Sequence, residues 1–285
     1  MVSQFKNLSH RKVAYMGWVE VIVLALVQGL TEFLPVSSSG HLVVANALLE
    51  ELGWPPAENL VEVNIVLHLG TLLAILTHYR KEILRLVGND WRVLGYLLAG
   101  TIPAAVVGFY VKKILPDAME KQVLENVLLA GWMFPVTAVL LIYAMRKSPG
   151  EKDYMGIGYT SAIAIGVAQA LAILPGISRS GATIAAGIGF GMQREAAATF
   201  AFLLAIPAIA GAGLLEGLEA WEQGSTGTPV GVLVVGFIVS FVVGWVSLLL
   251  LIRFLRRGRL ALFAWYLIPL GIAVIGWQLW ERLIG

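Results

Sequence analysis

Six stretches of about 20 apolar residues run through this chain, and an α-helix needs about that many to cross a bilayer. The six stretches are Val61–Tyr79, Val93–Val111, Val123–Met145, Ala196–Leu215, Val230–Ile252 and Leu260–Trp280. Charged residues make up 13% of the 285 residues, whereas soluble domains carry about 25%. Only helices and closed barrels satisfy the backbone hydrogen bonds of a chain in lipid. The sequence therefore predicts an all-α polytopic membrane protein surrounded by membrane lipids.

Charge and cysteine content exclude several other classes. The formal net charge is +2, and the sequence has no clustered basic face of the kind that binds nucleic acid. The chain has no cysteine, which excludes disulfides, thiolate metal sites and a cysteine nucleophile. We expect no nucleic acid among the partners, and the formation of a homodimer is left open.

Two further apolar regions, residues 18–49 and 154–191, are interrupted in the middle. The first contains FLPVSSSGH (Phe33–His41) and the second contains LPGISRSGAT (Leu174–Thr183). Each region reads as a short helix, a break rich in Pro, Ser and Gly, and another short helix. Irregular backbone at membrane depth is tolerated where it is buried in protein or lines a cavity. The pattern therefore predicts two re-entrant hairpins.

The two broken regions resemble each other at one offset of 141 residues, which separates Gln28 from Gln169. The other matched positions are Ser37, Ser39 and Gly40 in the first region and Ser178, Ser180 and Gly181 in the second. Matched broken segments are typical of inverted-topology repeats, although Ser/Gly/Pro turns also match by chance. We predict one membrane domain with an N-terminal extension (1–15) and two repeats (16–145 and 154–285), each with one hairpin and three spans.

Basic residues gather in the loops after the first, third and fifth spans. Cytoplasmic loops carry an excess of Lys and Arg, so these three loops are predicted to face the cytoplasm. The two hairpins then enter the membrane from opposite faces. The basic N-terminus, with Lys6, Arg11 and Lys12, argues for the opposite orientation.

Ionisable side chains inside apolar segments are costly and are functional candidates by default. Glu32, His41 and Arg179 are such residues. Gln28 lies four residues before Glu32, so the two share one helix face and could hold a divalent cation through their oxygens. The alternative is a carboxylate at a helix end that accepts hydrogen bonds from the following serines. His68 lies four residues after Asn64 in the first span and could face the same site, but it is interpreted as a packing residue.

Ser38 and His41 are three residues apart in a glycine-containing turn. A serine nucleophile needs a nearby base, and histidine titrates near neutral pH. The alternative is a capping serine beside a structural histidine.

An anion site is predicted around Arg179, because a guanidinium is always charged and its planar fork of donors fits phosphate. A helix that begins near Ser180 would add its positive end. The alternative for Arg179 is an internal ion pair with Glu32, and both can hold. The further substrate-binding candidates are Ser37, Ser39, Ser178, Ser180, Thr183, Gly176 and Gly181.

QGLTEFLPVSSSGH (Gln28–His41) and LPGISRSGAT resemble the two signature motifs of the bacterial undecaprenyl-pyrophosphate phosphatase family of the bacitracin-resistance type. The resemblance implies six spans and two re-entrant hairpins in an inverted repeat. It also implies removal of the terminal phosphate from undecaprenyl pyrophosphate, which recycles the lipid carrier for cell-wall synthesis. A divalent cation (Mg²⁺ or Ca²⁺) and a site open to the periplasmic face of the bacterial plasma membrane are implied as well.

The family's serine and histidine fall on Ser38 and His41, and its arginine falls on Arg179. Gln28 stands at the first acidic position, so Glu32 alone brings a carboxylate to the expected metal site. Three mechanisms stay open: attack by Ser38 with His41 as base, attack by His41, and attack by activated water.

Two rival functions are considered. A phosphatase of the phosphatidic-acid-phosphatase type is disfavoured, because no histidine follows His78. A secondary transporter or lipid flippase, with Arg179 as counter-ion, would share the inverted-repeat fold.

Overall fold

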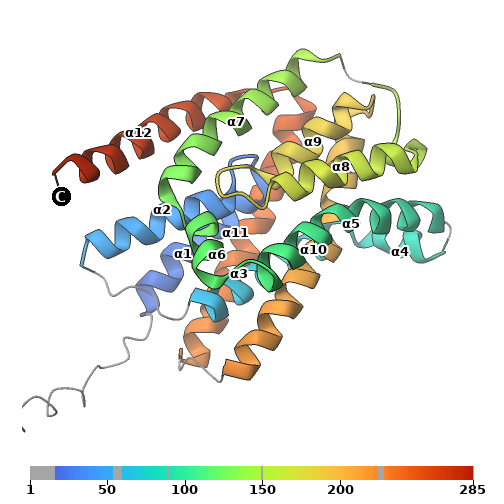
Figure 1. The fold of residues 1–285 in the computed structure, drawn as a ribbon. Coiled ribbons are helices and arrows are strands. Elements are labelled where there is room, and N and C mark those ends of the chain that lie inside the picture. The colour runs from blue at the N-terminus through green and yellow to red at the C-terminus, as the bar shows by residue number, and fades with distance from the viewer. Residues whose placement is uncertain (1–16, 54–59, 89, 149, 224–227, 285) are drawn as a thin grey trace, which may run out of the picture.

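The computed structural model describes residues 17–53, 60–88, 90–148, 150–223 and 228–284 (Figure 1). The predicted extension 1–15 lies outside these residues. The described residues form twelve α-helices and one 3₁₀ turn, with no strand among them. The helices are α1 (Trp18–Phe33), α2 (Ser38–Glu51), α3 (Leu60–His78), α4 (Arg80–Gly88), α5 (Trp91–Lys113), α6 (Asp117–Leu124), α7 (Val127–Arg146), α8 (Tyr159–Leu171), α9 (Arg179–Gly189), α10 (Arg194–Gln223), α11 (Val230–Arg256) and α12 (Leu262–Ile284). The prediction of an all-α chain is confirmed.

Five of these helices, α5, α7, α10, α11 and α12, are long and apolar enough to cross a membrane. A sixth span is added if α3 and α4 count as one, because this pair is apolar but bends by 76° near Tyr79. Five to six spans agree with the predicted polytopic membrane protein. Large apolar side chains such as Trp265 and Leu283 are exposed on the outer faces, as expected where lipid is the solvent.

Predicted span boundaries differ from the observed helix ends by a few residues in several places. The third predicted span starts at Val123, but α7 starts at Val127 because Asn126 caps it by accepting a hydrogen bond from the Leu129 N–H at 2.9 Å. The fourth predicted span, Ala196–Leu215, is part of a longer helix, since α10 has 30 residues.

Both predicted broken regions consist of two short helices. A four-residue break (34–37) separates α1 from α2, and a seven-residue break (172–178) separates α8 from α9. Residues 154–158 precede the second pair of helices and contain the 3₁₀ turn Tyr154–Gly156, which Asp153 caps. The helical part of the second region therefore begins at Tyr159.

Each short entry helix packs against a long helix of the other half of the chain. A Cβ added to Gly29 of α1 would lie 3.0 Å from the backbone nitrogen of Gly244 in α11. A Cβ added to Gly166 of α8 would lie 2.1 Å from the carbonyl oxygen of Gly100 in α5. Glycines let helix backbones approach closely in membranes, so α1 is fixed by α11 and α8 is fixed by α5.

The core surrounds the end of α1. Phe33, the last residue of α1, is fully buried, and its ring meets that of Phe202 in α10 edge to face at 5.6 Å. Ser247 of α11 donates a hydrogen bond to the Leu30 carbonyl at 2.7 Å. These contacts hold the last turn of α1, which carries Glu32. A further pair, α7 and α12, runs side by side along one edge of the molecule (Figure 1).

Candidate active site

The two breaks are in direct contact. The Ser37 hydroxyl of the first break accepts a hydrogen bond from the Gly176 N–H of the second at 3.1 Å. A Cβ added to Gly40 would lie 2.7 Å from the same nitrogen. In the other direction, the Ser180 hydroxyl donates to the Leu34 carbonyl at 3.4 Å. Motifs 141 residues apart in sequence thus form one site, as expected.

Glu32 lies at the centre of this site and is buried. Its Oε1 forms an ion pair with the Arg179 guanidinium. Its Oε2 accepts hydrogen bonds from the Ser38 hydroxyl at 2.6 Å and from Gln28 Nε2 at 3.0 Å. Three partners on one buried carboxylate stabilise its charge, because charge-assisted hydrogen bonds are the strong ones. Gln28, Ser38 and Arg179 therefore all contact a fourth predicted site residue, Glu32.

Gln28 leaves one polar atom for a ligand. Its side chain is buried, and its Oε1 has no hydrogen-bond partner. A buried amide oxygen without a partner calls for an explanation such as an ion or water. Among the described residues, no cluster of three or more His, Cys, Asp or Glu side chains could hold a metal ion. Mg²⁺ is often held by one carboxylate together with phosphate oxygens, and Gln28 and Glu32 carry oxygens of the kind that such a cation binds.

His41 is bound at both ring nitrogens. Nδ1 lies 2.7 Å from the Ser37 carbonyl oxygen and therefore carries a proton. Nε2 lies 2.8 Å from the hydroxyl of Tyr266 in α12. The rings of His41 and Tyr266 are stacked, with centroids 5.7 Å apart, and the Phe134 ring meets the imidazole edge to face at 5.1 Å. Ser38 therefore contacts Glu32 in this structure and has no hydrogen bond to His41.

Hydrogen bonds to backbone groups fix the shape of the second break. The Ser178 hydroxyl caps α9 by accepting from the Gly181 N–H at 3.1 Å. Thr137 of α7 donates to the Gly176 carbonyl at 2.8 Å and accepts from the Ser178 N–H at 2.9 Å. Gly176 has a φ of 94°, and a Cβ there would lie 2.4 Å from the Ala130 carbonyl oxygen, so only glycine fits. This backbone places Arg179 at the first position of α9, close to the expected start of that helix.

The hydroxyls of the expected anion site already form hydrogen bonds within the protein. Ser178 and Ser180 lie within 3.1 Å of each other, and Thr183 donates to the Arg179 carbonyl at 2.8 Å. All three hydroxyl-bearing residues are buried, whereas the Arg179 side chain is 19% exposed. Ser39 is exposed and lies 3.3 Å from the Ser37 hydroxyl. Arg179 is therefore the member of the set that is best placed to meet a ligand.

Sequence reasoning missed two neighbours of the site and gave too little weight to a third. Tyr266 and Thr137 lie inside apolar spans, where nothing in the local pattern distinguishes them from packing residues. His68 was interpreted as a packing residue, but it lies close enough to Glu32 for the two to interact electrostatically. Its spacing four residues from Asn64, whose carbonyl binds His68 Nδ1 at 2.8 Å, was the available signal.

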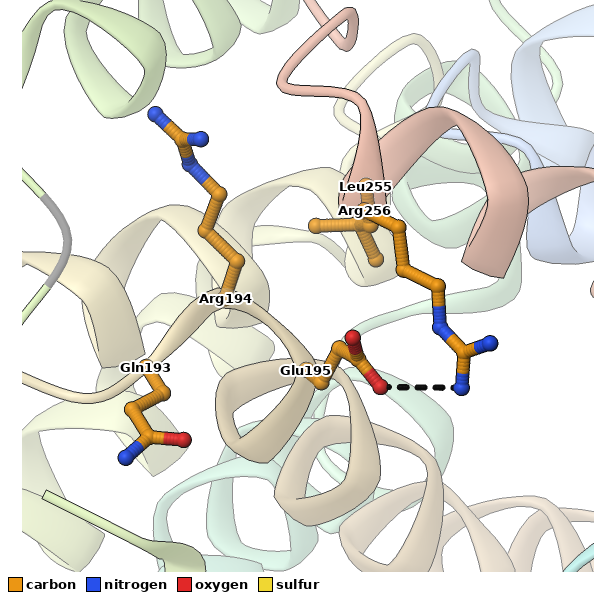
Figure 2. A pocket seen from close by; sticks show the side chains of 5 residues that line it. All are labelled: Gln193, Arg194, Glu195, Leu255 and Arg256. Atoms are coloured by element: carbon orange, nitrogen blue, oxygen red, sulfur yellow. Dashed lines mark ion pairs between the residues drawn. The ribbon is translucent and has the colours of Figure 1, made fainter.

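A surface cavity of about 310 Å³ lies elsewhere, where α10 begins and α11 ends (Figure 2). It is lined by Gln193, Arg194, Glu195, Leu255 and Arg256. Figure 2 shows Glu195 and Arg256 facing each other, and their ion pair measures 3.1 Å. None of the predicted site residues lines this cavity, so it is separate from the cluster around Glu32.

Comparison with known proteins gives consistent matches over most of the chain. The family model described as "Bacitracin resistance protein BacA" matches residues 21–273. An undecaprenyl-diphosphatase of Rhodopirellula baltica is 46% identical over 258 residues, which cover 90% of this chain and 96% of the relative. An undecaprenyl-diphosphatase of Alcanivorax borkumensis is 40% identical and covers 92% and 99%. Undecaprenyl-diphosphatase 4 of Bacillus cereus is 37% identical and covers 92% and 98%.

Proposed function

We infer the activity from the family: this chain belongs to the family of the bacitracin resistance protein BacA. It is an undecaprenyl-diphosphatase, an enzyme that hydrolyses undecaprenyl diphosphate to undecaprenyl phosphate and inorganic phosphate. The reaction returns a lipid carrier to cell-wall synthesis and is linked to bacitracin resistance. The transporter and flippase alternative is not favoured.

One observation carries the assignment of the active site. Glu32 contacts Arg179, Ser38 and Gln28 at once, so a carboxylate, a cation, a hydroxyl and an amide from both motifs meet. We propose that Arg179 exchanges its ion pair with Glu32 for the diphosphate of the substrate. A guanidinium binds phosphate oxygens in a bidentate manner, and the partly exposed side chain of Arg179 supports this exchange.

Ser38 is the proposed nucleophile. Its oxygen attacks the terminal phosphorus, the bond from that phosphorus to the bridging oxygen breaks, and undecaprenyl phosphate leaves. The Ser38 proton passes to Glu32 Oε2, which already accepts a hydrogen bond from this hydroxyl at 2.6 Å. This contact favours Glu32 over His41 as the acceptor in the first step.

Water then hydrolyses the phosphoserine. Glu32 returns its proton to the Ser38 oxygen, so the proton of the attacking water needs a second base. His41 is the proposed second base, because Nε2 of its neutral imidazole accepts a proton, which reaches it through the Tyr266 hydroxyl bound there at 2.8 Å. Throughout the reaction, Arg179 neutralises the charge on the transferred phosphoryl group.

A divalent cation is also part of the proposal. Gln28 Oε1 and Glu32 would hold Mg²⁺ or Ca²⁺, and the partnerless, buried Oε1 supports this assignment. When bound, such an ion neutralises phosphate oxygens and acts as a Lewis acid.

The proposed architecture is an inverted repeat of six spans and two re-entrant hairpins, over residues 16–145 and 154–285. The reciprocal packing of α1 on α11 and α8 on α5 supports it, since these helix pairs correspond under the 141-residue offset. We place the protein in the bacterial inner membrane with the site open to the periplasm, because the basic loops between spans are predicted to be cytoplasmic.

The test is phosphate release by the purified protein in detergent from undecaprenyl diphosphate and from undecaprenyl phosphate. Release from the diphosphate alone, abolished by EDTA and restored by Mg²⁺ or Ca²⁺, is expected. Arg179→Ala should lower the rate about 100-fold or more. Arg256→Ala, which removes a guanidinium from an exposed pair with Glu195, is the matched control and should stay within about twofold.

Two results would contradict the proposed anion site and the proposed nucleophile. Folded Arg179→Ala protein with the wild-type rate would overturn the anion site. A radiolabelled terminal phosphate that is trapped on His41 in the quenched enzyme, or on no residue, would replace Ser38 by His41 or by water.

A further inference from the structure

We propose that Tyr266 assists the hydrolytic step of the phosphatase reaction: it holds the imidazole of His41 in place and passes the proton of the attacking water to Nε2. The proposal rests on the function proposed above, in which His41 serves the hydrolytic step. It adds a helix, α12, that neither signature motif contains.

The geometry around His41 leaves little freedom for its ring. Two hydrogen bonds, to the Ser37 carbonyl at 2.7 Å and to the Tyr266 hydroxyl at 2.8 Å, bind opposite edges. The Tyr266 ring stacks on one side at an interplanar angle of 18°. The Phe134 ring of α7 meets the imidazole at 65°. The first break and two helices, α7 and α12, therefore fix the orientation of a single side chain.

Tyr266 lies at the boundary between two faces of α12. Leu267 and Ala264 are buried against the protein, whereas Trp265 is 80% exposed. Tyr266 is 47% exposed, and its hydroxyl turns to His41. A tyrosine hydroxyl in an apolar region needs a hydrogen-bond partner, so this contact serves both residues.

The hydrogen bonds also define which nitrogen acts. Because a carbonyl oxygen can only accept, the Nδ1 proton of His41 belongs to the bond with Ser37. In the neutral ring, Nε2 then accepts a hydrogen bond from the Tyr266 O–H. In the hydrolytic step the attacking water gives its proton to the Tyr266 oxygen while the Tyr266 proton passes to Nε2, and the Tyr266 oxygen then accepts a hydrogen bond from the protonated ring. Tyr266 therefore offers a partner in both protonation states.

Other groups near the imidazole do not offer this function. The neighbours that act on it are the backbone carbonyls of Val36 and Ser37 from its own hairpin, Phe134 from α7 and Tyr266 from α12. Within the described part of the chain, no charged side chain is paired with His41. The effect of Tyr266 on the proton affinity of His41 should therefore be visible in the pH profile.

The kinetic test compares Tyr266→Phe with Tyr110→Phe. Tyr110 of α5 is 51% exposed and lies outside the site, so this variant is a matched loss of one hydroxyl. Tyr266→Phe keeps the ring and should lower kcat about five- to tenfold, the scale of one hydrogen bond, with little change in KM. The acidic limb of the kcat profile should move to lower pH, because the Tyr266 oxygen accepts a charge-assisted hydrogen bond from the imidazolium, which is the stronger of its two contacts with the ring. Tyr110→Phe should match the wild type.

A double mutant separates positioning from a structural role. If Tyr266 acts through His41, Tyr266→Phe in a His41→Asn background should cause no further loss of kcat. Additive losses would overturn the proposal, and so would equal kcat, KM and pH profile in Tyr266→Phe and Tyr110→Phe.

Imidazole ¹H–¹⁵N spectra of the protein in detergent provide a readout that does not need activity. The chain has four histidines, and the His41 signals are those lost in His41→Asn. Tyr266→Phe should shift the Nε2 signal of His41 and leave those of His68 and His78 in place, which also reports an intact fold. Unchanged His41 signals would overturn the proposal. Shifted signals in an enzyme whose His41→Asn variant is fully active would instead overturn the catalytic function given to His41.

Discussion

Ser37 in the first break and Ser178 in the second occupy equivalent positions before a helix. The Ser37 hydroxyl accepts from the Gly40 N–H at 3.3 Å, and the Ser178 hydroxyl accepts from the Gly181 N–H at 3.1 Å. Each of the two serines also meets a second hydroxyl two residues later. The hydroxyl cap at the start of α2 therefore resembles that at the start of α9.

The side chains that follow the two caps differ. Arg179 of the second break corresponds to Ser38 of the first, and Ile173 corresponds to Glu32. The first break thus supplies a carboxylate and a hydroxyl, and the second supplies a cation. The two breaks therefore share a serine cap but carry different chemical groups. Neither break forms the site alone.

The two breaks also differ in where the backbone is left-handed. Ser37 has a φ of 73° in the shorter break, whereas in the longer break Gly176 has the positive φ of 94°. A non-glycine residue in this region costs about 1–2 kcal/mol. Ser37 accepts a second hydrogen bond, from Gly176 N–H, which offsets part of this cost.

The largest expected effect comes from removing the carboxylate that only the first break carries. Glu32→Gln should lower phosphate release about 1000-fold, because it removes both the partner of Arg179 and the proton acceptor of Ser38. The control Glu195→Gln removes an exposed carboxylate that pairs with Arg256 at 3.1 Å and should stay within about twofold. A Glu32→Gln rate within tenfold of the wild type would contradict the proposal that the first break supplies an essential carboxylate.

The matched glycines should differ in stability. A Cβ at Gly40 would lie 2.8 Å from the Gly176 Cα, whereas a Cβ at Gly181 would lie 3.2 Å from the Ser178 Cβ. Gly40→Ala should lower the free energy of unfolding in detergent by about 1–3 kcal/mol through overpacking, and Gly181→Ala by less. Equal losses would mean that the two breaks tolerate the methyl group alike.

The matched glutamines should differ in cation dependence. Gln28 contacts Glu32 at 3.0 Å, whereas Gln169 has Ile173 at the corresponding position. Gln28→Ala should raise the Mg²⁺ concentration for half-maximal activity about tenfold, corresponding to the loss of one ligand. Gln169→Ala should leave it unchanged. Titration of the EDTA-treated enzymes with Mg²⁺ distinguishes the two variants. If only Gln169→Ala raised the Mg²⁺ concentration for half-maximal activity, the cation would have to be assigned to the second break.

The smallest expected difference concerns the caps themselves. Ser178→Ala removes the cap of α9, while Ser37→Ala removes a cap and the hydrogen bond from the Gly176 N–H. Ser37→Ala should therefore be less stable than Ser178→Ala by about 1 kcal/mol. Thermal unfolding of both variants in one detergent measures the difference, and the reverse order would contradict it.

Much of this site could be predicted from local patterns. Apolar length located the spans, and ionisable residues in apolar segments pointed to Glu32 and Arg179. A shared offset indicated that the two breaks would meet. The start of α7 could have been predicted from the capping residue Asn126, which was read as part of a longer apolar run.

The partners of His41 could not be predicted in this way. Tyr266 is 225 residues away, and on its own helix it resembles the lipid-facing aromatic residues around it. Ser38 was paired with His41 by spacing, but the carbonyl of Ser37 and the hydroxyl of Tyr266 bind the imidazole, and a carboxylate is the stronger acceptor for Ser38. Such competition among partners depends on tertiary contacts that spacing does not contain.

The reciprocal packing of the entry helices has a consequence for biosynthesis. Gly29 of α1 rests on Gly244 of α11, which the ribosome adds roughly 10 to 40 s later at 5–20 residues per second. In the first part of this interval Glu32 is already inside or beside the membrane, while Arg179 has not yet been made. The nascent first half therefore needs the translocon or a chaperone to shelter a carboxylate, and the chain should become resistant to membrane proteases only once its second half has been inserted.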